Sequence, residues 1–268
     1  MRFAFGKNWR SFLDRLDDDR ISESVRALTV SLDRARLDGL RVLDIGSGSG
    51  LSSLAFRRLG ADVTSFDYDE DSVACTRLLR DRFYPEASEW RVAQGSVLDE
   101  TYMSSLGTYD IVYAWGVLHH TGAMWRAIDQ AAARVQVGGT LVVAIYNDQG
   151  WRSRLWLSIK RLYCSGWAGR TGVVAVFYPL FAAYALGLDL RRGRMPGTHA
   201  REYARHRGMS LVHDWKDWLG GYPFEVASPD AMQGYLQAKG LQLRRKTTTR
   251  GWGCNELVLT RQEQETHG

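Results

Sequence analysis

The sequence predicts an α/β protein: a doubly wound, mainly parallel sheet with helices on both faces. The first observation is the stretch Val42–Leu54, in which an apolar run is followed by Gly46, Gly48 and Gly50 and then by apolar residues at helical spacing. This order indicates a glycine turn between a buried strand and a helix N-terminus. The second observation is that five strand patterns alternate with helical patterns along the chain, which favours parallel strands.

The spacing of apolar residues predicts the helices and the strand on either side of the glycine turn. A helix is expected before the first strand, because apolar residues recur there at helical spacing: Ile21, Val25, Leu28, Leu32 and Ala35. A second strand is expected over residues 63–67, ending at Asp67. The helix that follows ends near Pro85, and its apolar stripe is expected to hold Ala74, Cys75, Leu78 and Leu79.

Three further strands are expected over residues 90–94, 109–115 and 140–146. The pair Gly138-Gly139 is expected to turn the chain into the last of these. The helix before that turn is expected to carry Met124, Ile128, Ala131 and Val135.

The chain is expected to end in one more helix and an antiparallel strand pair. Ser228 is expected to cap the helix, with Pro229 at its first position and its end near Gly240. Residues 241–248 and 254–261 then read as two strands joined by a Gly-Trp-Gly turn.

Composition and charge narrow the function classes. The 268 residues are 45% hydrophobic and 24% charged, as in a globular protein with a full core. The net charge of +5 suits an anionic substrate, a membrane surface or nucleic acid. No zinc-finger spacing or aromatic RNA-binding signature is present, which argues against nucleic acid.

Cysteine usage bears on the compartment. Cys75, Cys164 and Cys254 are widely separated and form no Cys-x-x-Cys pair, which argues against disulfides and a metal site. The amino-terminal residues have no continuous apolar run, so no signal peptide is expected. We therefore expect a cytoplasmic protein that holds no metal.

The glycine turn is of a kind that binds nucleotides. No Lys-Ser or Lys-Thr follows Gly50, so the turn is not a P-loop, and Gly50 comes one residue earlier than the third glycine of the dinucleotide fingerprint. Asp67, at the end of the second strand, can accept hydrogen bonds from ribose hydroxyls. A tight turn without a ligand is the alternative.

The pattern Asp44-x-Gly-x-Gly-x-Gly50, followed by Asp67, resembles class I S-adenosylmethionine (SAM)-dependent methyltransferases. The resemblance suggests the small-molecule group that includes the ubiquinone-biosynthesis methyltransferases. The resemblance implies a Rossmann-like, seven-stranded sheet, with SAM as cofactor and S-adenosylhomocysteine (SAH) as product. The family commonly has an Asp where Ser96 stands. The cofactor-binding residues that the resemblance implies are Asp44, Gly46, Ser47, Gly48, Gly50, Asp67, Tyr68, Ser96, Val97 and Trp115.

The chain divides into four expected segments. Residues 1–40 form an amino-terminal cap segment and helix, and residues 41–147 form the SAM-binding core. Residues 148–227 form a helical insertion, and residues 228–268 complete the sheet. A Phe-Gly-x-Asn-Trp sequence ending at Trp9 is expected to cover the open side of the cleft, or to pack on the sheet edge.

Catalytic candidates are sought at the carboxyl ends of the strands, where ligands bind in this fold class. His119 and His120 follow the fourth strand and have a side chain suited to general base work, as does His213 in the insertion. Because adjacent side chains do not face one ligand together, one histidine of the first pair is expected to be structural. The expected acceptor contacts are Trp9, Tyr146, Asn147, Asp214, Trp215 and Tyr222.

The insertion is expected to be an active-site lid and acceptor pocket. One of its helices is expected to carry an apolar stripe of Trp151, Leu155, Ile159 and Leu162. Its apolar run, residues 173–188, is shorter than the roughly twenty residues that span a bilayer, and Pro179 interrupts it. The alternatives are an amphipathic surface resting on anionic lipid and simple packing against the core.

The function expected from these features is SAM-dependent O-methylation of a small-molecule acceptor. N- or C-methylation is the alternative within enzymes. An interaction protein that binds SAM and has lost transferase activity is the alternative outside them. The oligomeric state is left open.

Overall fold

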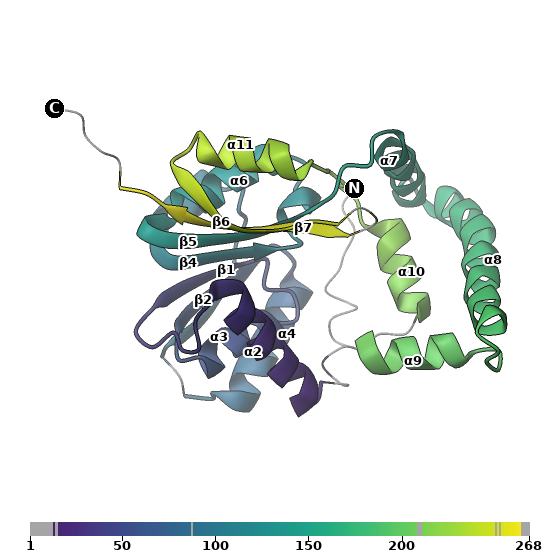
Figure 1. Cartoon of the computed structure of the whole chain (residues 1–268), viewed down its shortest axis with the longest axis horizontal. Coiled ribbons are helices and arrows are strands. Elements are labelled where there is room, and N and C mark those ends of the chain that lie inside the picture. The colour runs from purple at the N-terminus through teal and green to yellow at the C-terminus, as the bar shows by residue number, and fades with distance from the viewer. Residues whose placement is uncertain are drawn as a thin grey trace.

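The computed structural model describes residues 13, 16–86, 88–207, 211–249, 251 and 253–263, without the side chains of 204–207, 213, 214 and 217. Within these residues the chain forms one seven-stranded sheet in the order β3-β2-β1-β4-β5-β7-β6 (Figure 1). Only the pairings of β7 with β5 and β6 are antiparallel. The strands are β1 (Arg41–Ile45), β2 (Asp62–Asp67), β3 (Trp90–Gln94), β4 (Tyr109–Trp115), β5 (Val135–Tyr146), β6 (Leu241–Thr247) and β7 (Cys254–Arg261).

Helices cover both faces of the sheet, as expected. The described helices are α2 (Asp18–Leu32), α3 (Leu51–Arg58), α4 (Glu70–Phe83), α5 (Glu100–Ser105), the 3₁₀ helix η1 (Leu118–His120), α6 (Met124–Ala133), α7 (Trp151–Cys164), α8 (Trp167–Arg191), α9 (Thr198–Arg207), α10 (Leu211–Gly220) and α11 (Pro229–Gln237). In Figure 1, α2, α3 and α4 lie on one side of the sheet and α6 and α11 on the other.

Two apolar layers form because strand side chains alternate between the faces. Val42 and Ile111 pack with α2, α3 and α4, while Leu43 and Val112 pack with α5, α6 and α11. The strand order reverses between β1 and β4. In open α/β sheets this switch point, at the carboxyl ends of the strands, is where ligands bind.

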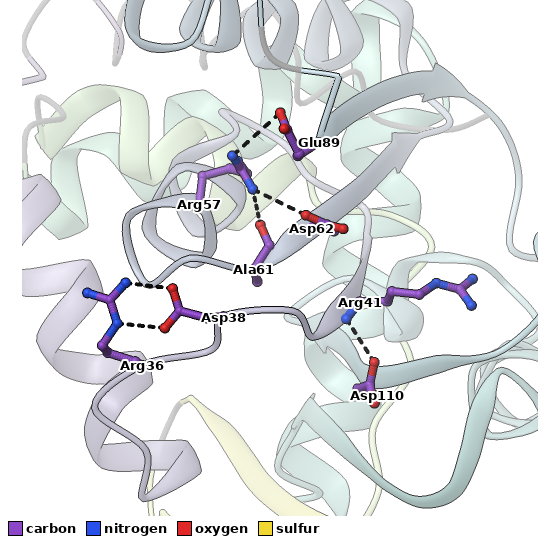
Figure 2. Close-up of polar contacts among 8 residues, drawn as sticks. All are labelled: Arg36, Asp38, Arg41, Arg57, Ala61, Asp62, Glu89 and Asp110. Carbon is purple, nitrogen blue, oxygen red and sulfur yellow. Dashed lines mark hydrogen bonds and ion pairs between the residues drawn. The ribbon is translucent and has the colours of Figure 1, made fainter.

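The opposite end of the sheet is held by polar contacts, shown in Figure 2. The half-buried end of α3 carries Arg57, whose guanidinium donates to the carbonyl oxygen of Ala61 and lies 3.7 Å from Asp62 and 3.9 Å from Glu89. The backbone N–H of Arg41 donates to Asp110 at 2.8 Å. The Arg57 contacts tie the end of α3 to the segments that begin β2 and precede β3, and the Arg41 contact ties β1 to β4. All of them lie at the amino ends of the strands, away from the switch point.

Three local expectations were wrong. Val135 begins β5 instead of ending α6, so Gly138 lies inside the strand, where its φ of +76° accompanies an irregular register with β4. Leu78 is exposed, because α4 buries Ser72, Val73, Cys75, Thr76 and Leu79. α2 ends at Leu32, before Ala35, because Asp33 adopts a left-handed φ of 53°.

The insertion forms a helical unit at one end of the sheet, with α8 on its outside (Figure 1). It has a small core of its own, in which Tyr163, Cys164, Val173 and Leu219 are buried. The apolar stripe expected on α7 is mostly exposed: Trp151, Leu155 and Leu162 face solvent. The side of α7 that packs inward carries Ser153, Lys160, Tyr163 and Cys164.

Candidate cofactor and acceptor site

The glycine turn after β1 is bound to the end of β2. The backbone N–H groups of Gly46 and Ser47 donate to the carbonyl oxygen of Phe66 at 2.8 and 3.1 Å. The N–H of Gly48 donates to the carboxylate of Asp67 at 3.0 Å. All three glycines of the turn have a positive φ, from 55° to 83°. Glycine adopts this conformation without the strain that a side chain would add, which explains why three glycines form the turn at the switch point.

Asp67 holds a partly buried carboxylate beside this turn. It accepts from the backbone N–H of Asp69 at 2.9 Å as well as from Gly48. Burial raises the pKa of Asp67, and these N–H groups lower it in part. Neighbouring Tyr68 is exposed. A carboxylate held at the end of β2, next to the glycine turn, has the chemistry to receive two ribose hydroxyls.

Asp44 supports the turn from inside the protein. Its buried carboxylate accepts from the hydroxyl of Ser53 on α3, and Ser53 in turn lies 2.7 Å from Ser65. Burial and the nearby charge of Asp67 raise the pKa of Asp44 to about 7, although the Ser53 hydrogen bond lowers it. The contacts of Asp44 among the described residues are therefore structural, and its contact with a cofactor stays a prediction.

The loop after β3 lies next to Asp67. The N–H of Gly95 donates to the carbonyl oxygen of Asp67 at 3.0 Å, which brings Ser96 and the buried Val97 to the same edge. The hydroxyl of Ser96 accepts from Leu98 N–H at 3.2 Å. These positions fit the predicted adenine side of the site.

Trp115 ends β4 and is half exposed. Its indole N–H donates to Glu256 on β7 at 2.9 Å, and the same carboxylate accepts from Ser31 on α2. This contact orients the ring on the α2 side of the sheet. Its cofactor role stays a prediction.

The two histidines in η1 have different surroundings. His119 is fully buried, and neither ring nitrogen has a hydrogen-bond partner with good geometry among the described residues. Burial lowers the pKa of His119 well below its ordinary value; the charges of His120 and Lys160 add to this, and a backbone group of Ala144 opposes it. His119 is therefore a neutral imidazole.

His120 is partly buried, and its Nδ1 lies 2.7 Å from the carbonyl oxygen of Pro223. A carbonyl oxygen only accepts, so Nδ1 carries a proton, and in the neutral form of the ring the lone pair is on Nε2. The segment that holds Pro223 is itself docked on the loop, because the N–H of Glu225 donates to the carbonyl oxygen of His119 at 3.0 Å.

Aromatic rings connect the histidines to the insertion. The ring of Tyr146, at the end of β5, lies 4.0 Å from that of His119 and 5.5 Å from that of His120, centroid to centroid. It also lies 6.0 Å from Trp218 on α10 and 5.4 Å from Phe224. The structure thus brings the predicted residue Tyr146 together with both histidines.

A buried cation lies in the same cluster. The ammonium of Lys160 on α7 donates to the carbonyl oxygen of Trp218 and lies 4.6 Å from the Trp218 ring and 4.9 Å from the Phe224 ring. Sequence reasoning did not identify Lys160 as a site residue. The signal that would have found it is the spacing of Ser153, Trp156, Lys160 and Tyr163, which also fits one face of a helix.

The other described acceptor candidates make contacts with other parts of the protein. The side-chain amide of Asn147 donates to the carbonyl oxygen of Thr249 at 3.0 Å and accepts from the side-chain amide of Asn255 at 3.0 Å. Trp215 packs on α8, 5.4 Å from Phe181, and Tyr222 packs in the insertion core. Trp9 lies outside the described residues. So do the side chains of His213 and Asp214. No three metal-ligating side chains gather among the residues that are described.

The comparisons with known proteins agree with this geometry. The model of a family described as a methyltransferase domain matches residues 9–241. The chain belongs to this methyltransferase family. The family and the seven-stranded, mainly parallel fold expected from the sequence are thus confirmed.

Curated relatives align with half of this methyltransferase. The ubiquinone biosynthesis O-methyltransferase of Rhodopseudomonas palustris is 31% identical over 134 residues, which are 50% of this chain and 50% of the relative. The protein of the same name from Bradyrhizobium diazoefficiens is also 31% identical over 134 residues. The chain therefore spans about half the length of the curated relatives that it matches.

Solved structures share its fold. Magnesium protoporphyrin IX methyltransferase from Synechocystis, solved with bound SAH, has a TM-score of 0.51 and 18% identity, over 90% of this chain and 81% of that one. The N-methyltransferase NodS from Bradyrhizobium japonicum has a TM-score of 0.51 and 14% identity, over 92% and 100%. At these identities the likeness shows the fold alone.

Proposed function

We propose that this methyltransferase transfers the methyl group of SAM to a hydroxyl of a small-molecule acceptor, and that His120 is the general base. The observation that carries the proposal is the hydrogen bond from His120 to Pro223 at the carboxyl end of β4. It leaves Nε2 as the basic nitrogen of a partly buried imidazole in the loop that follows β4. The name of the curated relatives supports a hydroxyl acceptor.

The residues of the switch point fit SAM. The glycine turn Gly46–Gly50 would pass its methionine part, Asp67 would receive the ribose hydroxyls, and Ser96 and Val97 would lie on the adenine side. When bound, SAM supplies a methyl group already activated by its sulfonium charge. The protein therefore has to align the acceptor, exclude water and remove one proton.

Proton removal is assigned to His120 over His119. His119 is completely buried and its pKa is lowered far from neutrality, so it is a weak base with no route to an acceptor. His120 is held by Pro223 through Nδ1, so that Nε2 takes the proton of the acceptor hydroxyl. A base in this position contributes about 10²–10⁴-fold to the rate.

The acceptor side is built from aromatic rings. Tyr146 lies next to both histidines, and Trp218 and Phe224 lie next to Tyr146. Lys160 adds a buried positive charge that acts on the pKa of His119. An apolar or aromatic acceptor packs well against such rings, and a nearby cation favours an ionised hydroxyl.

We place the reaction in the cytoplasm, where the three free cysteines stay reduced.

The test measures binding and turnover separately. SAM affinity is measured by calorimetry, and transfer to a catechol by SAH release. We expect His120→Gln to lower kcat about 10²–10⁴-fold with SAM affinity unchanged. His199→Gln, on α9, serves as the matched control and should leave kcat unchanged.

The outcomes distinguish the parts of the proposal. Absence of SAM binding contradicts the cofactor assignment. SAM binding with transfer only to an amine contradicts O-methylation, and an unchanged kcat in His120→Gln contradicts the assignment of the base.

A further inference from the structure

The outward side of α8 is an apolar surface. Among the described residues, α8 is the helix that is long and apolar enough to cross a membrane by length and composition, and only 11% of its 18-residue apolar window is buried. Every exposed position from 175 to 190 is Ala, Val, Pro, Leu, Tyr or Gly. Val176, Leu180 and Tyr184 form one row along the helix and are 56%, 57% and 69% exposed. Exposing an apolar surface of this kind to water is unfavourable, and such surfaces mark sites of interaction with a protein or a membrane.

The exposed charges of α7, α8 and the turn after them are positive, and one of them, on Arg194, is paired with Glu202 on α9. Residues 151–195 contain eight basic side chains and one acidic one. Seven of the basic side chains are exposed arginines, while the acidic residue, Asp189, is buried and accepts from the backbone N–H groups of Gly197 and His199. Arg170 stands near the start of the apolar run, and Arg191 and Arg192 follow its end. Anionic headgroups complement this arrangement.

We propose that α8 lies flat on an anionic membrane, with its outward apolar residues among the acyl chains and its flanking arginines at the lipid phosphates. Trp167 at the helix start is 82% exposed and has the amphipathic ring that favours the bilayer interface. On α7, Trp151, Leu155 and Leu162 are exposed as well. This surface is independent of the proposed methyl transfer.

The inward side of α8 decides between lying on the bilayer and crossing it. Its Phe177 ring packs 5.5 Å from Trp156, and its Phe181 ring packs 5.4 Å from Trp215. A crossing would break these contacts and place Asp189 in hydrocarbon or strip it of its partners, which is unfavourable. The helix also continues without a break through Pro179, which lies on the exposed side. An in-plane position keeps every one of these contacts.

Vesicle flotation tests the proposal. The full chain is mixed with phosphatidylcholine vesicles, with and without phosphatidylglycerol, at low and high salt. We expect flotation with the anionic vesicles at low salt, and less at high salt or without phosphatidylglycerol. Arg191→Gln with Arg192→Gln should lower the partition coefficient about 30-fold, because each arginine near such a surface contributes about fivefold. Leu180→Glu with Tyr184→Glu should abolish flotation.

Matched controls use equally exposed residues elsewhere. Arg77→Gln with Arg91→Gln removes two exposed arginines from α4 and β3, and Val30→Glu with Val137→Glu adds two acids at positions 56% and 57% exposed. Both should float as the unchanged protein does. Circular dichroism confirms that each variant is folded.

Three results would overturn the proposal. One is the absence of flotation, or flotation equal in all variants. Another is resistance to alkaline carbonate extraction, which indicates a helix that crosses the bilayer. The third is a dimer in sedimentation that Leu180→Glu dissociates, which assigns the surface to a second copy of the chain.

Discussion

A Cβ atom on Gly46 would lie 2.3 Å from Cγ2 of Val117, closer than non-bonded carbon atoms approach. Val117 leads directly into η1, which carries the two histidines. The glycine turn after β1 and the histidine loop after β4 are therefore packed against each other without a gap. The contact between Gly46 and Val117 therefore links the predicted cofactor side of the site to the loop that carries the proposed base.

Replacing Gly46 by Ala is expected to destabilise the protein by about 2–5 kcal/mol, because a left-handed φ costs about 1–2 kcal/mol and overpacking about 1–3 kcal/mol. Gly107→Ala is the control, since Gly107 has a φ of +74° with no atom within 4 Å of the added methyl. Urea denaturation measures both. Adding Val117→Ala to Gly46→Ala should recover the overpacking part. Equal losses at Gly46 and Gly107 would contradict the close contact.

Removing the carboxylate of Asp67 is expected to weaken SAM binding. Asp67→Ala loses a charge-assisted hydrogen bond of about 1.5–3 kcal/mol, or on the order of ten- to a hundredfold in Kd. Asp99→Ala is the control, because Asp99 caps α5 by accepting from Tyr102 N–H at 3.0 Å. It should lower stability by about 1 kcal/mol and leave SAM affinity unchanged. Unchanged affinity in folded Asp67→Ala would remove the ribose assignment.

The buried carboxyl of Asp44 makes stability depend on pH. Its pKa is about 7 in the folded protein against an ordinary value of 3.8, so the folded state binds the proton more tightly than the unfolded chain does. The contribution of Asp44 to stability is complete below the unfolded pKa and is lost as the pH rises towards 7, by roughly 4 kcal/mol at most. Asp44→Asn lacks this loss.

Urea denaturation of both proteins between pH 5 and 8 measures the effect of Asp44. The stability of Asp44→Asn relative to the unchanged protein should rise with pH and level off above 7. A constant difference across this range would show that Asp44 is already ionised in the folded state at pH 5.

The amide of Asn147 is expected to be structural. Asn147→Ala leaves the buried Asn255 without one partner, and an unpaired group of this kind costs about 1–3 kcal/mol. Asn255→Ala should give a similar loss of stability, and neither variant should change the KM for the acceptor. A raised KM in Asn147→Ala alone would instead support the acceptor role predicted from the sequence.

Much of the fold was predictable because its signals are local. The strands β3, β4 and β7 have the bounds expected from their apolar runs, and the Ser228–Pro229 start of α11 is confirmed by the Ser228 hydroxyl, which accepts from Ala231 N–H. Strand periodicity and cap chemistry depend on residues within a few positions of one another. Two faces of α7 fit helical spacing. The sequence predicts burial of the more apolar face, and the structure buries the other one.

The sequence by itself determined the glycine turn, the acidic end of β2, the doubly wound, mainly parallel sheet and the methyltransferase family. Only the tertiary structure decided that His119 is buried while His120 donates to Pro223, that Lys160 lies among aromatic rings, and that the apolar run of α8 faces outward. Each of these depends on which distant segment covers a side chain. A local pattern shows that a face is apolar, but the path of the whole chain decides whether protein or solvent lies against it.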